Sequence, residues 1–391
     1  MLTLDDAFDS CHYIATAMAS TTTLPSLPAE LLLEIFLHLP HEDTRTFLRI
    51  NSHFRRIAQP YAYRYGTMTK FGLHFPGAAH PYPFCDDPNP EALKITEKKR
   101  EWIASQLERI DVVPHSELDC ASPPPHILCP SVLNVLRLDW HISSDPGFCI
   151  PENGSGCMHE YSINFGGCAF LNTVLQNCPQ GYREVIARGV PRPDGSGAMY
   201  PENYPVTTGR HVSVLCSQPP SVPRTSDCLT QPDLETFDVS GRQCGEHLEV
   251  IFWTSRPGQA WIPPCEFYVN GDMLNANVCH PRGETVWSRL FDIAYFHRLK
   301  KVTVVNATAI VPPGSTPDEH EARLSRGEVN MRDNEDLFIA NAEKQKEWLD
   351  NPITATFEFI AMEQWIRRNT WGDVFTYAEL DPWLTAMREE T

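Results

Sequence analysis

Apolar side chains lie on almost every side of the first helix that the sequence predicts, residues 27–40. A helix that covers one side of a core needs a single apolar stripe. This helix must therefore be buried from two sides, by the short helices that follow and by another domain or another protein. Its longest apolar row is Leu27, Leu31, Ile35 and Leu39, and its only polar row is Glu30, Glu34 and His38.

Two shorter helices are predicted directly after the first. Pro40 disfavours the helical conformation at Leu39 and ends the first helix. Acidic and hydroxyl side chains at 42–44 favour the start of a second helix. Asn51 offers a cap for a third helix, which we expect to end at Pro60. Three short helices form only a small core, so we expect this unit to gain stability by docking.

A sequence motif runs through these helices. It opens with Leu27-Pro28-x-Glu30-Leu31-Leu32-x-Glu34-Ile35-Phe36-x-x-Leu39-Pro40 and continues with Asp43, Arg49-Ile50-Asn51 and Phe54-Arg55-Arg56-Ile57-Ala58. This motif resembles an F-box over residues 24–64, and is closest to those of filamentous and mushroom-forming fungi. Thr44 departs from the family, which usually has Leu there, and Asn51 stands where many members have Cys. Neither departure lies in the first helix.

The resemblance implies a three-helix F-box domain that binds the small Skp-family adaptor and, through it, the cullin scaffold of a ubiquitin ligase. The rest of the chain would recruit a protein substrate. An ordinary helical hairpin inside a larger α domain is the alternative, but the Leu-Pro opening, the Leu-Pro closing and the Phe-Arg-Arg turn argue against it. The adaptor-binding residues that the resemblance implies are Leu27, Pro28, Leu31, Leu32, Ile35, Phe36, Leu39 and Pro40.

The chain outside the motif divides into segments of different composition. Residues 1–23 predict a flexible leader, and residues 65–90, rich in Pro, Gly and His, predict a linker. Residues 91–391 are expected to form one α/β substrate-recruiting domain. An amphipathic helix is predicted over 94–110, and the charged segment 316–336 predicts a mobile insertion.

Short strand signals alternate with Pro/Gly loops after residue 125. The pattern Leu-x-x-Leu-x-Leu, typical of leucine-rich repeats, occurs at 133–138 and, with other apolar residues, at 234–239 and 299–304. A buried strand is also predicted over 247–253. Regular repeats return every 20–29 residues, and these matches lie much farther apart. An irregular α/β sheet is therefore favoured over a degenerate leucine-rich-repeat horseshoe.

The C-terminal third carries the clearest helical patterns. Helices are predicted over 334–348 and 377–390, with Pro382 near the start of the latter, and 355–368 begins as a strand and continues as a helix. Aromatic residues in this part fit a core better than a binding groove. They are Trp348, Trp365, Trp371, Phe375 and Trp383.

Composition narrows the partners and the compartment. The 391 residues carry a net charge of -18, and an acidic chain is repelled by phosphate backbones and anionic membranes, so neither nucleic acid nor a membrane is an expected partner. No apolar run is long enough to span a bilayer, and the N-terminus does not resemble a signal peptide. The 13 cysteines, an odd number, lack Cys-x-x-Cys spacing. Reduced thiols, no metal and a location in the cytoplasm and/or nucleus follow as expectations.

Signatures of catalysis are missing from the sequence. It contains no Gly-x-Ser-x-Gly elbow, no phosphate loop and no paired-histidine helix. We therefore expect no enzyme activity, no catalytic residues and no cofactor. Two alternatives stay open: an enzyme domain with a pocket in the α/β region, fused to an F-box, or an F-box protein that acts outside a ligase.

Overall fold

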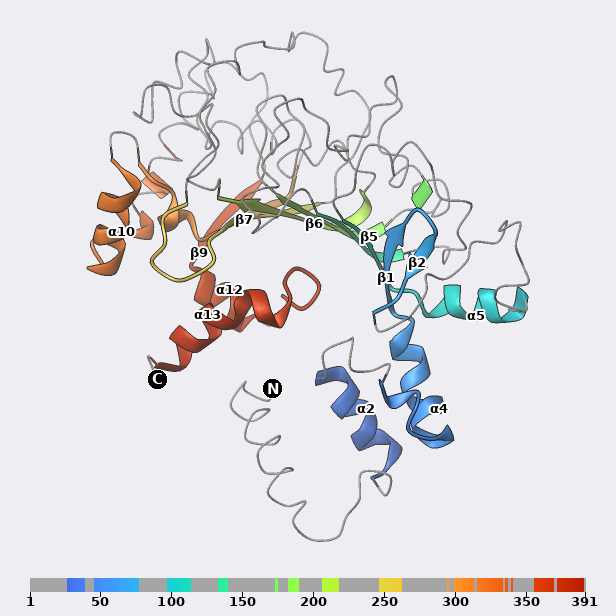
Figure 1. Cartoon of the computed structure of the whole chain (residues 1–391). Helices are drawn as coiled ribbons and strands as arrows, with labels where there is room; N and C mark the ends of the chain where they lie inside the picture. The colour runs from blue at the N-terminus through green and yellow to red at the C-terminus, as the bar shows by residue number, and fades with distance from the viewer. Residues whose placement is uncertain are drawn as a thin grey trace.

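A computed structural model shows an arched sheet with a helical hairpin at one end and two C-terminal helices beneath it (Figure 1). All structural statements concern the residues that the structure describes. These are residues 27–38, 46–76, 97–113, 133–139, 173–174, 182–189, 206–217, 246–261, 294, 299–312, 315–332, 335–336, 339, 355–368 and 371–389.

The N-terminal hairpin consists of α2 (Ala29–His38) and α4 (Ser52–Ala62). Asn51 caps α4, because its side-chain oxygen accepts a hydrogen bond of 2.9 Å from the backbone N–H of Phe54. The predicted end at Pro60 was wrong, since α4 continues through Pro60 to Ala62. Of the predicted second helix, residues 46–47 are helical and 48–50 form a turn, while 39–45 lie outside the described residues.

The sheet contains nine strands in the order β2-β1-β3-β4-β5-β6-β7-β8-β9. Strands β1 and β2 form an antiparallel hairpin, and every other neighbouring pair is parallel. The strands are β1 (Tyr65–Thr69), β2 (Gly72–His74), β3 (Arg109–Val112), β4 (Leu133–Asp139), β5 (Tyr182–Gly189), β6 (Val206–Cys216), β7 (His247–Trp253), β8 (Lys301–Val305) and β9 (Thr356–Ile360).

This architecture confirms the expected α/β domain, and it shows in addition that the sheet is mostly parallel. From β3 to β9 the strands follow one another across the sheet in chain order, but their starting residues are unevenly spaced, so the sheet is irregular. The strands expected at 133–138, 247–253 and 299–304 correspond to β4, β7 and β8. The strand expected at 234–239 lies outside the described residues.

Two expectations at the start of the sheet need correction. Residues 65–76, expected in a linker, include β1 and β2. The helix expected over 94–110 is shorter, since α5 spans Glu97–Gln106 and residues 109–112 form β3. Residues 109–112 alternate between polar and apolar side chains, and pairing with β1 and β4 on both sides decides in favour of a strand.

Both faces of the sheet carry apolar clusters. The cluster on the convex face includes Ile110, Leu136 and Val185. The cluster on the concave face, called the hollow face below, includes Val135, Ile186 and Val212. This division follows from the alternation of side chains along each strand. The hollow-side cluster is completed by α12 (Met362–Arg367) and α13 (Tyr377–Glu389), so the sheet is covered there by the end of the chain.

Two of the C-terminal patterns are confirmed, whereas most of the helix expected over 334–348 lies outside the described residues. Strand β9 followed by α12 matches the strand-then-helix pattern at 355–368. Pro382 lies inside α13, at its sixth residue, farther from the start than expected. The charged segment 316–336 contains α10 (Pro317–Ser325), which begins with a capping box between Thr316 and Glu319. The mobility of this segment stays a prediction. None of the described helices is long and apolar enough to cross a membrane.

Candidate functional site

The helical hairpin packs on a small core of its own. Leu32 from α2 and Phe54 and Ala58 from α4 are completely or almost completely buried. Several further apolar side chains pack around them but are only partly buried, which agrees with the small core expected for this unit. They are Leu27, Ile35, Phe47, Leu48, Ile57 and Tyr61.

Two neighbouring leucines of α2 point to different sides of the helix. Leu32 is fully buried, whereas Leu31 is 50% exposed. Pro28 is also exposed, and Leu27 and Ile35 are partly buried against the hairpin core. Leu31 and Pro28 are therefore available to a partner, while Leu32 supports the fold. Of the other predicted adaptor-binding residues, the Phe36 side chain, Leu39 and Pro40 lie outside the described part of the chain.

An exposed apolar residue of the hairpin was missing from the predicted set. Ile50, in the turn before α4, is 52% exposed. Ile50 lies at the end of the segment where a second short helix was predicted, and the structure places it in a turn instead. Its position between the polar residues Arg49 and Asn51 is the signal that distinguishes it.

The hairpin joins the sheet without a flexible connection. Only Tyr63 and Arg64 separate the end of α4 from the start of β1. The Tyr63 ring makes edge contacts with Phe75 and Trp102, at centroid distances of 5.1 and 5.9 Å. The carbonyl oxygen of Arg64 accepts backbone hydrogen bonds from Glu108 and Arg109. Ring packing and backbone bonding thus hold the direction in which α4 leaves the sheet.

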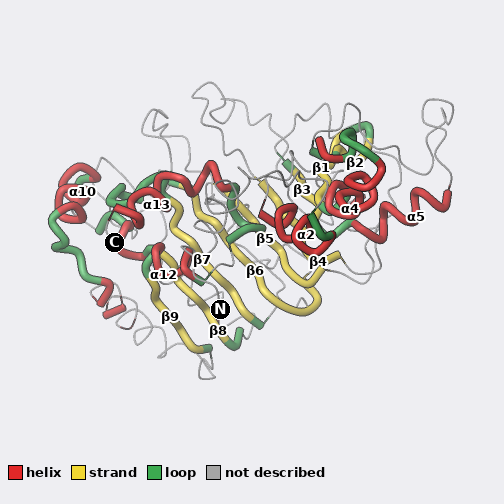
Figure 2. The backbone as a smooth tube through the Cα atoms, turned by 90° about the horizontal axis from the view of Figure 1, so that it is seen from below, coloured by secondary structure: helices red, strands yellow, loops and turns green. Residues whose placement is uncertain are grey.

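The hollow face of the sheet is covered by the C-terminal helices over β7 and the strands near it (Figure 2). The indole N–H of Trp365 donates to Glu249 on β7, at 3.1 Å, and that of Trp383 donates to the carbonyl oxygen of Thr254, at 2.9 Å. Phe375 packs against Trp253 with ring centroids 4.2 Å apart. Trp365, Phe375 and Trp383 are therefore core residues, as the sequence predicted.

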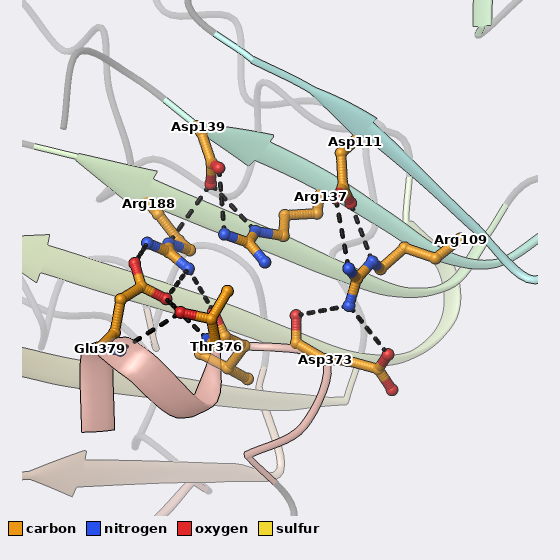
Figure 3. A network of polar contacts seen from close by, with 9 residues as sticks. Arg109, Asp111, Arg137, Asp139, Arg188, Asp373, Thr376 and Glu379 are labelled. Atoms are coloured by element: carbon orange, nitrogen blue, oxygen red, sulfur yellow. Dashed lines mark hydrogen bonds and ion pairs between the residues drawn. The ribbon is translucent and has the colours of Figure 1, made fainter. Parts of the chain in front are cut away.

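Ion pairs join the same C-terminal segment to β3 (Figure 3). Strand β3 lies next to β1, which follows the hairpin in the chain. Arg109 pairs with Asp111, two residues along β3, at 2.9 Å. Its Nη1 also donates to the side chain and the carbonyl oxygen of Asp373, at 3.3 and 3.4 Å. The Arg109 guanidinium lies over the Tyr65 ring of β1, 4.2 Å from its centre. The end of the chain thereby reaches the junction that carries the hairpin.

The second half of this network joins β4 and β5 to α13. Arg137 makes two hydrogen bonds of 3.1 Å to Asp139, and Asp139 also pairs with Arg188 at 3.3 Å. Arg188 donates to the carbonyl oxygen of Val374 at 2.6 Å and pairs with Glu379. Glu379 in turn accepts hydrogen bonds from the backbone and the hydroxyl of Thr376, which precedes α13.

Burial and charge act against each other on these carboxyl groups. Burial raises the pKa of Asp111, although Arg109 and Arg137 oppose that shift. Burial alone would also raise the pKa of Glu379, but its hydrogen bonds and its attraction to Arg188 outweigh burial and lower it. The network therefore holds Glu379 as a carboxylate where α13 meets the sheet.

A second charged group lies farther along the hollow face. Arg210 on β6 pairs with Glu184 on β5 at 2.8 Å and with Glu249 on β7. Glu358 on β9 pairs with Lys301 at 2.7 Å and with Arg368 at 2.6 Å. These cations are engaged within the fold, so the group stabilises contacts between strands.

The sequence analysis missed both networks, although it contained a signal for the first. The pattern Arg-x-Asp occurs at 109–111 and again at 137–139. On a strand, residues two apart point to the same face, so each Arg and Asp can pair there. The structure places Arg137 opposite Asp111 in the register of β3 and β4. Within the described residues, no group of three or more His, Cys, Asp or Glu side chains is placed to hold a metal ion.

Comparisons with known proteins add no relative. A scan against protein-family models, a search of curated proteins and a search of solved structures each found no match.

Proposed function

We propose that this chain is an F-box substrate-recruiting adaptor of a Skp–cullin–F-box ubiquitin ligase. Its N-terminal hairpin binds the Skp-family adaptor. The nine-stranded sheet and the helices packed on it, called the sheet unit below, hold a target protein. The observation that carries the proposal is the division of α2, which buries Leu32 in the hairpin and leaves Leu31 half exposed. That division occurs within the F-box-like motif, where the resemblance implies adaptor contact.

The junction between hairpin and sheet supports this function. A recruiting adaptor accelerates ubiquitin transfer by raising the effective concentration of its target near the ligase. A stiff connection serves this purpose because it limits the positions that the target can occupy. The direct passage from α4 to β1 is such a connection.

The covered hollow face restricts where a target can bind. Trp365, Ile366, Leu380 and Leu384 are buried beneath the sheet, and displacing side chains of this size costs about 1.5–3 kcal/mol each. We therefore place target recruitment on surfaces of the sheet unit that α12 and α13 leave open.

The proposal is tested by truncating the exposed apolar residues of the hairpin. Leu31→Ala combined with Ile50→Ala should weaken binding of a Skp-family adaptor about a hundredfold or more, because interface anchors contribute roughly 2 kcal/mol each and distant losses nearly add. Isothermal titration calorimetry with the full chain measures the affinity. Ile339→Ala is the matched control, since Ile339 is equally exposed, at 51%, outside the hairpin. Unchanged affinity in the double variant would refute adaptor docking through this hairpin.

A further inference from the structure

Helix α10 buries a single side chain, and that side chain is a histidine. His320 is 1% exposed, whereas the other residues of α10 are exposed or only partly buried. A helix on a protein surface normally docks through a stripe of several apolar residues. The docking of α10 depends instead on a group that can change its charge.

The imidazole of His320 is buried in one protonation state. Its Nε2 lies 2.9 Å from the carbonyl oxygen of Thr308 and must donate, because a carbonyl oxygen only accepts. In the neutral ring Nδ1 then carries no proton, and this atom is buried without a hydrogen-bond partner among the described residues. A second proton at Nδ1 would bury a positive charge and an N–H donor that no described acceptor satisfies, which is unfavourable.

Helix α10 joins the segments that follow two neighbouring strands, at the end of the sheet opposite the hairpin (Figure 1). His320 donates to Thr308, in the segment 306–311 after β8. Glu321 accepts a hydrogen bond of 3.1 Å from the backbone N–H of Ala260, in the segment 254–261 after β7. Two adjacent residues of α10, both ionisable, therefore hold the helix on these two segments.

Few charged groups among the described residues act on His320. Burial has the largest influence and lowers the pKa of His320 below its ordinary value of 6.5. Arg323 on the same helix adds to this shift, whereas the hydrogen bond to Thr308 and the nearby Glu321 oppose it. The segment after β7 contributes one ionisable residue, Arg256, which pairs with Glu321 at 3.5 Å, and the segment after β8 contributes none.

We infer that α10 is a lid that acid releases from the segments following β7 and β8. Protonation of His320 opens the lid, because the charged ring is hydrated when the helix is released and is not hydrated when it is docked. The helix keeps its own N-terminal capping box in both states, since Thr316 and Glu319 belong to the same segment. This inference concerns the sheet unit and does not rest on adaptor binding.

The direction and size of the effect follow from the titration of one group. Because His320 has a lower pKa in the docked state, docking is fully stabilised above pH 6.5 and weakens as the pH falls below that value. Between about pH 7.5 and 5.5 the opening constant of α10 should rise by up to about 10-fold, the limit for one histidine that titrates only in the released state.

Hydrogen exchange of the full chain at the two pH values tests the inference, after correction for the intrinsic dependence of amide exchange on pH. Exchange should increase in α10 and at the amide of Ala260, which α10 protects, and the corrected protection of β4–β8 should stay unchanged. An equal increase throughout β4–β8 would overturn the inference, because acid would then destabilise the whole sheet unit.

Two variants of adjacent residues assign the response. His320→Gln keeps an N–H donor for the Thr308 carbonyl oxygen but does not titrate, so its opening constant should be the same at both pH values. Glu321→Gln is the matched control, because it keeps an acceptor for the Ala260 N–H and leaves His320 intact, and it should retain the 10-fold response of about wild-type size.

The outcomes are distinct. An opening constant of wild-type α10 that does not depend on pH would overturn the inference. A full response in His320→Gln, or a lost response in Glu321→Gln, would also overturn it, because a group other than His320 would then control docking. Where His320→Gln releases α10 at both pH values, a response below pH 6.5 in both wild type and Glu321→Gln supports the inference, and its absence in either contradicts it.

Discussion

Among the described residues, the hairpin and the sheet unit differ in how many of their apolar side chains are buried and how many of their charged side chains are paired. The hairpin has three fully buried core residues and exposes Leu31 and Ile50. The sheet unit buries apolar clusters on both faces and pairs the charges that it encloses. The sheet unit also exposes single apolar side chains, Phe71 at 66% and Ile339 at 51%. Its two large buried clusters can nevertheless hold its fold, whereas the small core of the hairpin gains most by binding another protein.

The largest expected effect tests whether the sheet unit depends on its C-terminal cover. Trp365→Ala should reduce the free energy of unfolding by about 3–5 kcal/mol, because it leaves a large cavity between α12 and β7. Urea denaturation followed by tryptophan fluorescence and circular dichroism measures the loss. Tyr377→Ala, at an exposed residue of α13, is the control and should cost much less. A small loss for Trp365→Ala would mean that the cover is not part of the core.

A smaller effect tests the independence of the hairpin. Leu32→Ala should destabilise the hairpin by about 2–3 kcal/mol, because Leu32 is one of its few fully buried residues. Hydrogen exchange should increase along α4 and stay unchanged in β4–β8. A Skp-family adaptor should restore protection in α4, because a ligand stabilises the state that it binds. Faster exchange throughout the sheet would show that the two regions fold as one unit.

The ion pairs of Arg188 beneath the sheet should contribute less to the free energy of unfolding than Leu32 does. Arg188→Met leaves Asp139 and Glu379 without a shared cation. We expect a loss of about 2 kcal/mol, below the ~3–5 kcal/mol of a fully buried pair, because the Glu379 side chain is partly exposed. The double variant Arg188→Met/Glu379→Gln should lose less than the sum of the two single variants. Strict additivity would show that the two residues do not interact.

The smallest expected effect is on how the free energy of unfolding depends on pH under acidic conditions. Hydrogen bonds from Arg368 and then Lys301 lower the pKa of Glu358 to about 2, from an ordinary value of 4.5. A lowered folded-state pKa means that this stabilisation is complete above pH 4.5 and disappears as the pH falls toward 2. Glu358→Gln should therefore flatten the loss of stability in this range, by less than about 1 kcal/mol because solvent screens the pair. Parallel pH profiles for variant and wild type would contradict this assignment.

Local periodicity predicted the elements whose pattern is complete within a few residues. Strand β7 matches the predicted range 247–253, and the change from strand to helix within 355–368 appears as β9 and α12. Periodicity failed at 109–112, where an apolar residue at the helical spacing extended the predicted helix into β3. Composition misled at 65–76, where Gly and Pro suggested a linker. At 109–112 the pairing with β1 and β4 decided the conformation, and at 65–76 the local β1–β2 hairpin and the pairing of β1 with β3 did so.

The sequence by itself determined which faces of its clearest elements are apolar. The α2 pattern predicts burial from two sides. The Arg-x-Asp pattern at 109–111 places both side chains on one face only because the pairing with β1 and β4 makes this segment a strand. Only the tertiary structure decided that Asp373 meets Arg109, 264 residues earlier, and that Glu379 meets Arg188. Such contacts depend on where successive strands bring the end of the chain, and no local pattern contains that information. For the same reason, tertiary packing decided that Leu31 faces outward and Leu32 faces the hairpin core.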